Sequence, residues 1–165
     1  TRRYPFDFVI GSTHFIDRKD PAYPEFFEER GEANAYLQYF ETTLDNVSHL
    51  DDYDVAGHID YIVRYGPNKA AFYSYEAYRD ILDRILKAVI EHGKGIECNI
   101  SQPNPAADVL KRYRELGGEI LTIGSDAHIP EDLGADFERT RELLKECGFS
   151  YYSVFRQRKA QFLPL

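Results

Sequence analysis

The stretch Ile-Leu-Thr-Ile-Gly-Ser-Asp-Ala-His, residues 120–128, decides how the rest of the chain is interpreted. Its first four residues are apolar or β-branched and end at a glycine, which predicts a short buried strand. This strand would deliver Asp126 and His128 to one edge of a sheet, and the two side chains share a face if the backbone stays extended. A carboxylate beside an imidazole suits Zn, Mn or Fe. The alternative is a helix N-cap aspartate with a solvated histidine beside it.

The same order, an apolar strand followed by glycine and then histidine, occurs twice more upstream. Residues 4–10 are rich in β-forming side chains and lead into Gly-Ser-Thr-His, which ends at His14. Residues 53–60 predict a second strand that leaves through Gly-His-Ile-Asp and places His58 at its exit. Three histidines that each follow a strand end indicate a common site rather than chance.

The remaining strand and the remaining histidines are interpreted differently. Residues 95–100 predict a strand without a histidine, in which Glu97 and Asn99 point to the same face because side chains alternate along a strand. His49 and His92 fall at the C-terminal ends of predicted helices, where a histidine interacts favourably with the helix dipole. We expect these two histidines to be structural or solvated.

Strands and helices alternate along the whole chain. Apolar residues that recur at steps of three and four predict helices over 34–50, 75–91, 106–116 and 137–147. The tail, 151–165, is interpreted as a weak strand followed by an irregular end. Four strands that alternate with helices predict an α/β fold in which a parallel sheet is joined by helical crossovers. The polar strand exits would then meet at the carboxyl edge of the sheet, where such folds place their chemistry.

Composition limits the classes of partner. The 165 residues carry a net charge of −8 and no long basic stripe, so we expect no nucleic-acid partner. With no signal peptide or transmembrane run, we expect a cytoplasmic protein with no membrane partner, in which Cys98 and Cys147 are reduced thiols. The chain begins at Thr1 and contains no methionine, from which we expect N-terminal structure to be missing.

Four motifs in order carry a resemblance to a known family. They are Asp-Phe-Val-Ile-Gly-Ser-Thr-His-Phe-Ile (7–16), Gly-His-Ile-Asp-Tyr-Ile-Val-Arg-Tyr-Gly (57–66), Ile-Glu-Cys-Asn (96–99) and Gly-Ser-Asp-Ala-His (124–128). Together they resemble the PHP (polymerase and histidinol phosphatase) superfamily, and within it most closely the histidinol-phosphate phosphatases of histidine biosynthesis. The resemblance implies that residues 1–165 are a single PHP-type domain fragment, the C-terminal portion of a distorted (β/α)7, TIM-like barrel. About four parallel βα units would be present, and the N-terminal units missing.

The resemblance also implies a metal centre. Such enzymes hold up to three divalent ions, Zn, Mn or Fe, and hydrolyse a small phosphomonoester. The carried-over roles make His14 and His58 ligands of one metal, while Asp126 and His128 serve the other two. The family's N-terminal His-x-His motif, its next His and its bridging Glu are absent from this chain. We therefore expect partial metal occupancy, and little or no activity from this chain alone.

Further roles are expected for residues near these ligands. Asp126 would hold a metal close to the attacking water and so count as catalytic. Asp60 is a candidate proton donor, or a partner that orients His58, with a loop-capping aspartate as the alternative. Arg64 matches a family arginine that would capture the substrate phosphate through two parallel hydrogen bonds, and the alternative is a surface arginine. Asn99 would either bind substrate or fix the proline-rich loop that follows it.

These expectations define one leading hypothesis and two rivals. The leading hypothesis is a metal-dependent phosphatase that converts L-histidinol phosphate into L-histidinol and phosphate, present here as an incomplete part. The first rival is a PHP phosphoesterase with another substrate, because metal ligands fix the reaction type and loops choose the substrate. The second is a non-catalytic PHP module with a vestigial metal site. Open sheet edges would also permit a homodimer.

Overall fold

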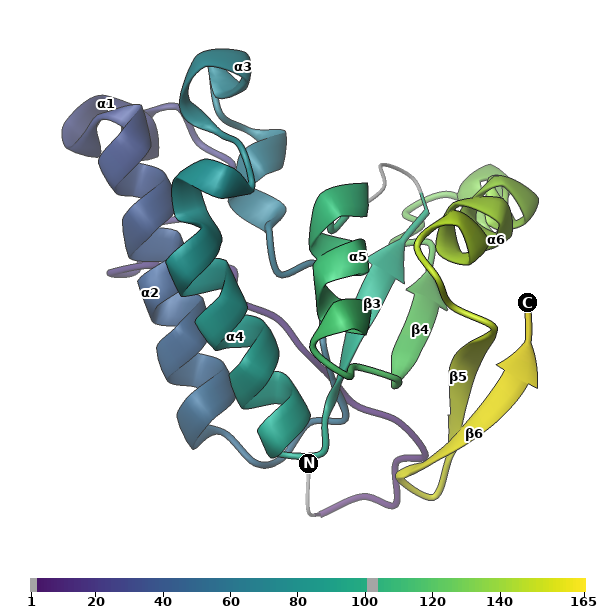
Figure 1. Ribbon diagram of the computed structural model, residues 1–165. Coiled ribbons are helices and arrows are strands. Elements are labelled where there is room, and N and C mark those ends of the chain that lie inside the picture. Colours follow the sequence, from purple (N-terminus) through teal and green to yellow (C-terminus); the bar gives the residue numbers. More distant parts are fainter. Residues whose placement is uncertain (1–2, 101–103) are drawn as a thin grey trace.

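The computed structural model describes residues 3–100 and 104–165, and it is built around a parallel sheet of four strands (Figure 1). The strands are β1 (Ile10–Gly11), β2 (Val55–Ala56), β3 (Gly95–Asn99) and β4 (Leu121–Gly124). Their spatial order follows the sequence, β1-β2-β3-β4, and every neighbouring pair is parallel. The predicted α/β fold with a parallel sheet is therefore confirmed. In the part of the chain that the structure describes, β1 and β4 are the edges of an open sheet.

The first strand is much shorter than its sequence predicts. Residues 4–9 were expected to be extended, but Phe6 turns back to donate its N–H to the carbonyl of Tyr4 at 2.9 Å. Asp7 uses both its carbonyl and its carboxylate to accept backbone N–H groups from the C-terminal hairpin. Because these backbone groups are satisfied outside the sheet, the ladder with β2 begins only at Ile10.

Helices cover one face of the sheet, where α2, α4 and α5 lie side by side (Figure 1). The helices are α1 (Glu25–Arg30), α2 (Glu32–His49), α3 (Lys69–Phe72), α4 (Arg79–Glu91), α5 (Ala107–Glu115) and α6 (Phe137–Glu146). Short 3-10 turns occupy η1 (Tyr61–Arg64), η2 (Glu76–Tyr78) and η3 (Pro130–Asp132). The four predicted helices are confirmed as α2, α4, α5 and α6, although α4 begins only after η2. The apolar stripe of α4 explains the packing, since Leu82, Ile85, Leu86 and Val89 are fully buried.

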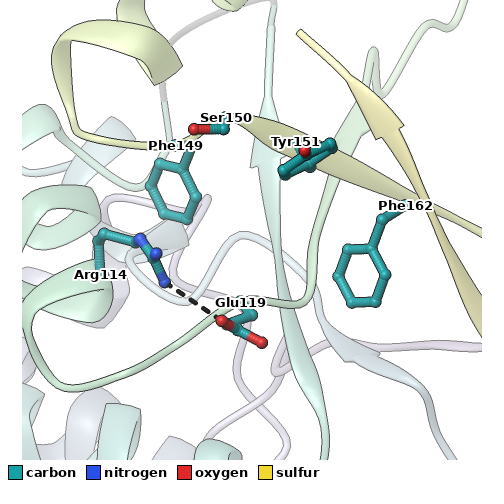
Figure 2. A pocket seen from close by; sticks show the side chains of 6 residues that line it. All are labelled: Arg114, Glu119, Phe149, Ser150, Tyr151 and Phe162. Carbon is teal, nitrogen blue, oxygen red and sulfur yellow. Dashed lines mark ion pairs between the residues drawn. The ribbon is translucent and has the colours of Figure 1, made fainter.

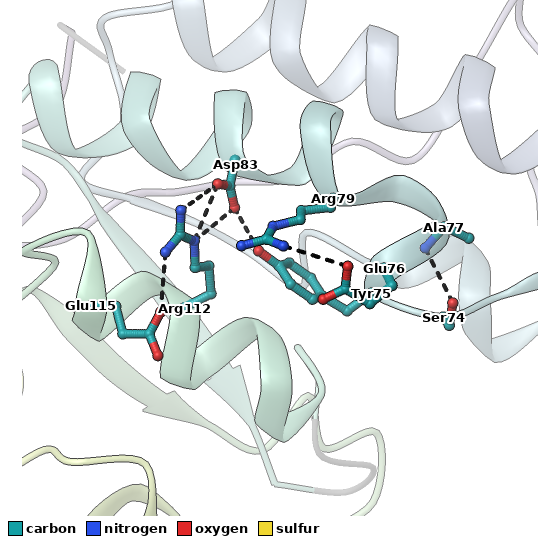
Figure 3. A network of polar contacts seen from close by, with 8 residues as sticks. All are labelled: Ser74, Tyr75, Glu76, Ala77, Arg79, Asp83, Arg112 and Glu115. Carbon is teal, nitrogen blue, oxygen red and sulfur yellow. Dashed lines mark hydrogen bonds and ion pairs between the residues drawn. The ribbon is translucent and has the colours of Figure 1, made fainter.

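A polar network joins α4 to α5 (Figure 3). Arg112 of α5 places Nε and Nη2 on the carboxylate of Asp83 in α4, at 3.0 and 2.6 Å. The hydroxyl of Tyr75 donates to the same carboxylate at 2.6 Å, and Nη1 of Arg112 pairs with Glu115 at 3.1 Å. Both carboxylate oxygens and all three guanidinium nitrogens are used, so the two helices are held at a fixed register.

The tail differs from its prediction. Instead of one weak strand and an irregular end, β5 (Tyr151–Arg156) and β6 (Lys159–Pro164) form an antiparallel hairpin beside β4. Its two-residue turn, Gln157 and Arg158, has φ of 51° and 63°, as hairpin turns that match strand twist require. Arg158 Nε then contacts both carboxylate oxygens of Asp54, at 2.8 and 2.6 Å, which anchors the hairpin near the start of β2.

None of the helices in residues 3–100 and 104–165 has the length and apolarity needed to cross a bilayer.

Candidate functional site

Two histidines from neighbouring strand exits meet at the carboxyl edge of the sheet. The ring centroids of His14, which follows β1, and His58, which follows β2, lie 4.9 Å apart at an interplanar angle of 75°. The ring of Tyr61 in η1 lies against both imidazoles, with centroids 5.0 and 4.9 Å away. Because β1 and β2 are adjacent and parallel, residues that follow them are delivered to the same edge.

His58 is the buried member of this pair. Its residue is 5% exposed, and its Nδ1 is buried with no hydrogen-bond partner. Burial, and then the neighbouring His14, lower the pKa of His58 to about 4. The ring is therefore neutral near pH 7, the form in which an imidazole binds a metal ion. His14, in contrast, is exposed to solvent.

A second pair of functional groups lies beside the imidazoles. Arg64, at the end of η1, places Nη1 3.1 Å from Oδ2 of Asp126, which follows β4. The other two guanidinium nitrogens of Arg64, Nε and Nη2, are buried without partners. The guanidinium carbon of Arg64 also lies 5.9 Å from the ring centroid of Tyr61, the ring that lies against both imidazoles. The guanidinium, with the carboxylate that it contacts, is therefore a neighbour of the imidazole pair.

The sequence suggested that the segment carrying Asp126 and His128 is extended, but in the structure it is not. Strand β4 ends at Gly124, and Asp126 adopts a left-handed backbone with φ of 51°. His128 is 89% exposed at its side chain, and its Nε2 lies 3.9 Å from Oδ1 of Asp126. The condition for a shared strand face, an extended backbone, is therefore not met, because the chain turns immediately after the sheet ends. The two side chains nevertheless remain neighbours.

Asp60 and Asn99 lie inside the protein rather than at its surface. Asp60 is 2% exposed and accepts the N–H of Ala106 at 3.2 Å, while its second carboxylate oxygen is buried without a partner. Burial raises the pKa of Asp60 to about 7. Asn99 is fully buried, and its backbone pairs with that of Asn104. Asp60 thus contacts the backbone of Ala106, and Asn99 that of Asn104, both of which lie shortly before α5.

Glu97 of β3 is a site residue to which the sequence assigned no role. The residue is 5% exposed, and Oε2 of its carboxylate accepts the backbone N–H of His58 at 3.2 Å. Burial raises its pKa above the ordinary value. Two features of the sequence could have indicated a role for Glu97. It alternates with Asn99, which places both side chains on one face of β3, and glycines precede His58 and Ser125 at the ends of the neighbouring strands.

The donor chemistry of this edge fits a divalent metal in part. A neutral buried imidazole with an unpartnered nitrogen, beside a second imidazole, is suited to zinc, and a carboxylate beside them is a compatible oxygen donor. Within residues 3–100 and 104–165, however, no group of three or more His, Cys, Asp or Glu side chains is arranged to hold an ion. The edge therefore provides two pairs of possible metal ligands, His14 with His58 and Asp126 with His128. A complete ligand shell needs further donors.

A separate cavity lies at the opposite ends of the strands (Figure 2). It has a volume of about 350 Å³ and is lined by Arg114, Glu119, Phe149, Ser150, Tyr151 and Phe162. Arg114 and Glu119 form an ion pair across it at 3.7 Å. Because Glu119 precedes β4 whereas Asp126 follows it, this cavity does not belong to the candidate site.

Comparison with known proteins defines the class to which this fold and site belong. The family model of the PHP domain matches residues 1–101, more than half of the chain. The chain therefore belongs to the PHP domain family.

The similar proteins are more specific. A histidinol-phosphatase of Lactococcus lactis is 33% identical over 158 residues, which are 92% of this chain and 59% of that protein. A probable histidinol-phosphatase of Thermotoga maritima is 34% identical, over 90% of this chain and 60% of that protein. The crystal structure of the Lactococcus lactis histidinol phosphate phosphatase, complexed with zinc, L-histidinol and phosphate, superposes with a TM-score of 0.87 at 31% identity. It matches 97% of this chain and 64% of the solved one. The chain thus spans about 60% of the length of the curated relatives.

Proposed function

We propose that this chain carries part of the metal centre of a phosphomonoester hydrolase whose substrate is L-histidinol phosphate. The observation that supports this most is the pairing of His14 and His58, with centroids 4.9 Å apart and an unpartnered nitrogen on the buried ring. A buried imidazole nitrogen without a hydrogen bond is uncommon unless the site serves a ligand or a reaction.

In this proposal His14 and His58 are ligands of one divalent ion, and Asp126 and His128 serve others. Zinc is the first candidate, since the solved relative was complexed with zinc, and the family pattern allows up to three ions, with Mn or Fe as alternatives. Bound divalent ions lower the pKa of water and neutralise charge on a phosphoryl group. The low pKa of His58 keeps its ring unprotonated and available for a metal.

Arg64 is the proposed phosphate-binding residue. Its side chain is 13% exposed, and two of its three nitrogens are buried without partners, so the protein does not satisfy its hydrogen-bonding capacity. A guanidinium matches two oxygens of a phosphate through parallel N–H donors. Asp126, which already contacts Nη1, would orient the guanidinium so that the other donors are free for substrate.

Asp60 and Asn99 have supporting roles in the proposal. Asp60, two residues after His58, keeps the chain segment at Ala106 in place and remains a candidate proton donor, because burial brings its pKa to about 7. Asn99 helps to place Asn104, with which its backbone pairs.

The choice of L-histidinol phosphate rests on the relatives. Curated proteins of 30–34% identity, from Lactococcus lactis, Clostridium acetobutylicum and Thermotoga maritima, are named histidinol-phosphatases or probable ones. Because the described residues supply only two donor pairs, we propose that the 165 residues alone hydrolyse substrate poorly and bind metal incompletely.

The experiment that tests this proposal uses the complete gene product. After zinc loading, phosphate release is measured from L-histidinol phosphate and from p-nitrophenyl phosphate, beside the 165-residue chain alone. The proposal expects zinc-dependent release with a strong preference for histidinol phosphate, and little release from the shorter chain. Equal rates on both substrates would support a phosphoesterase of other specificity. Zinc binding without any hydrolysis would support the non-catalytic module.

A further inference from the structure

Glu97 occupies the centre of the site without being one of its expected ligands. Strand β3 lies between β2 and β4, whose exits carry His58 and Asp126. The side chain of Glu97 reaches toward both neighbours, since it accepts the backbone N–H of His58 and covers Gly124 of β4. It is also nearly inaccessible to solvent, with the residue 5% exposed.

The backbone of His58 needs an external restraint. Its φ of 24° lies in the left-handed region, which residues with a Cβ rarely occupy and which persists only where the surroundings hold it. Glu97 holds the peptide group at this position, because Oε2 accepts the His58 N–H at 3.2 Å. On the other side of the residue, the His58 carbonyl accepts the N–H of Tyr61 at 2.8 Å. These two contacts restrain the backbone of His58 and so the direction in which its Cα–Cβ bond leaves the chain.

One glycine makes room for the carboxylate. A Cβ at Gly124 would lie 2.1 Å from Oε1 of Glu97, closer than real Cβ contacts come, whereas a Cβ at Gly57 would lie 3.4 Å from Oε2, an ordinary van der Waals distance. Gly57 is instead confined by Ser12 and Ile10, whose Oγ and Cγ2 would be 2.4 and 2.7 Å from the added atom. The end of β4 is therefore shaped around Glu97, which explains the glycine at position 124.

We propose that Glu97 is a positioning residue that fixes the backbone of His58 and so aims its ring at His14, without touching metal or substrate. The consequence for metal binding rests on the proposed function, whereas the consequence for the His58 backbone does not. A direct ligand would need the carboxylate charge, but a positioning residue needs only an acceptor of the same shape. Glutamine and leucine at this position therefore separate the two roles.

The test compares Glu97→Gln and Glu97→Leu in the complete gene product. Zinc affinity is measured by competition with a chromophoric chelator, and the His58 amide is followed by hydrogen exchange. Leucine is expected to weaken zinc binding by about 10–100-fold and to accelerate exchange at His58, because loss of such an orienting partner typically has this effect. Glutamine is expected to restore zinc affinity to within about threefold of wild type, since its amide oxygen still accepts the N–H.

Glu32 offers a matched control, because it is a buried glutamate that accepts a backbone N–H, from Asn68, outside the metal site. Glu32→Leu should lower the melting temperature while leaving zinc affinity and His58 exchange unchanged. If Glu97→Leu does not fold, Gly124→Ala provides the second route, since the added methyl group displaces the carboxylate from its place. It should accelerate His58 exchange in the same way.

The outcomes separate the two proposals. A glutamine variant that loses as much zinc affinity as leucine would overturn the positioning role in favour of a direct charge or ligand. Unchanged exchange at the His58 amide in both Glu97→Leu and Gly124→Ala would overturn it as well. If the wild-type protein binds no zinc or hydrolyses no phosphomonoester, the proposed function fails, while faster His58 exchange in Glu97→Leu would still support the positioning role.

Discussion

Two polar regions of this molecule satisfy their hydrogen bonds in opposite ways. Between α4 and α5, Asp83 and Arg112 use both carboxylate oxygens and all three guanidinium nitrogens within the protein. At the carboxyl edge of the sheet, His58, Asp60 and Arg64 each have at least one buried polar atom without a partner. Unpartnered buried polar groups are unfavourable for folding. The first region therefore stabilises the fold, and we propose that the second binds a group from outside the chain.

The largest effect on zinc content and activity should come from His58, the buried histidine whose Nδ1 has no hydrogen-bond partner. Replacing His58 with alanine removes a proposed ligand, and should lower zinc content and reduce kcat/KM for histidinol phosphate by roughly 100-fold or more. His92→Ala is the matched control, because that histidine is exposed at the end of α4. Metal analysis and phosphate release are measured on the same preparations. A His58 variant with unchanged zinc content would contradict the assigned role.

A somewhat smaller effect is expected at Arg64. Arg64→Lys keeps a positive charge near Asp126 but loses the planar pair of donors, so kcat/KM should fall about tenfold or more while zinc content stays unchanged. Arg79→Lys is the control, because Arg79 is an exposed arginine whose ion pair with Glu76 lies away from the site. Steady-state kinetics on histidinol phosphate provide the measurement. Equal kinetics in both lysine variants would show that Arg64 does not bind substrate.

In the region between α4 and α5, where the hydrogen bonds are satisfied, a substitution should change the stability of the protein but not its zinc content or activity. Asp83→Asn weakens the contacts with Arg112 and Tyr75, and should lower the midpoint of thermal unfolding by roughly 2–6 °C in a domain of this size. Zinc content and kcat should remain at the wild-type level below the transition. A fall in zinc content would mean that the two regions are coupled and would contradict their separate roles.

The smallest effect concerns pH. The hydrogen bond to Arg112 holds the pKa of Asp83 below its ordinary value, which is about 4 in an unfolded chain. A carboxyl with a lowered pKa contributes stability above the unfolded pKa, and that contribution is lost as the pH falls through the folded pKa. The difference in melting temperature between wild type and Asp83→Asn should therefore be present near neutral pH and shrink below about pH 4. A constant difference across this range would contradict it.

Sequence periodicity was sufficient for most of the fold. Leu82, Ile85 and Leu86 predict the buried face of α4, and the apolar runs before Gly57 and Gly124 predict strands whose exits share one edge. These features depend on local patterns of period 3.6 and 2, which can be recognised in the sequence without knowing the contacts between distant segments. The strand ends that carry histidines could be predicted from the sequence for the same reason.

The missed features depend on contacts between distant segments. The hairpin of β5 and β6 turns through Gln157 and Arg158, which carry no glycine or asparagine signal, and it is anchored by Asp54 about a hundred residues away. The left-handed backbone of Asp126 contradicts the extended strand that its flanking residues suggest. Glu97 appeared as one polar residue in a strand, and only the neighbouring strands reveal that it holds His58.

The central claim is that parallel strand exits bring His14 and His58 together as ligands of one ion. The most direct test is a crystal structure of the zinc-loaded gene product, with zinc located by anomalous scattering. We expect a zinc ion within about 2.0–2.1 Å of one nitrogen from each of these two rings. Zinc bound elsewhere with both imidazoles unligated, in a protein that nonetheless hydrolyses histidinol phosphate, would contradict the account.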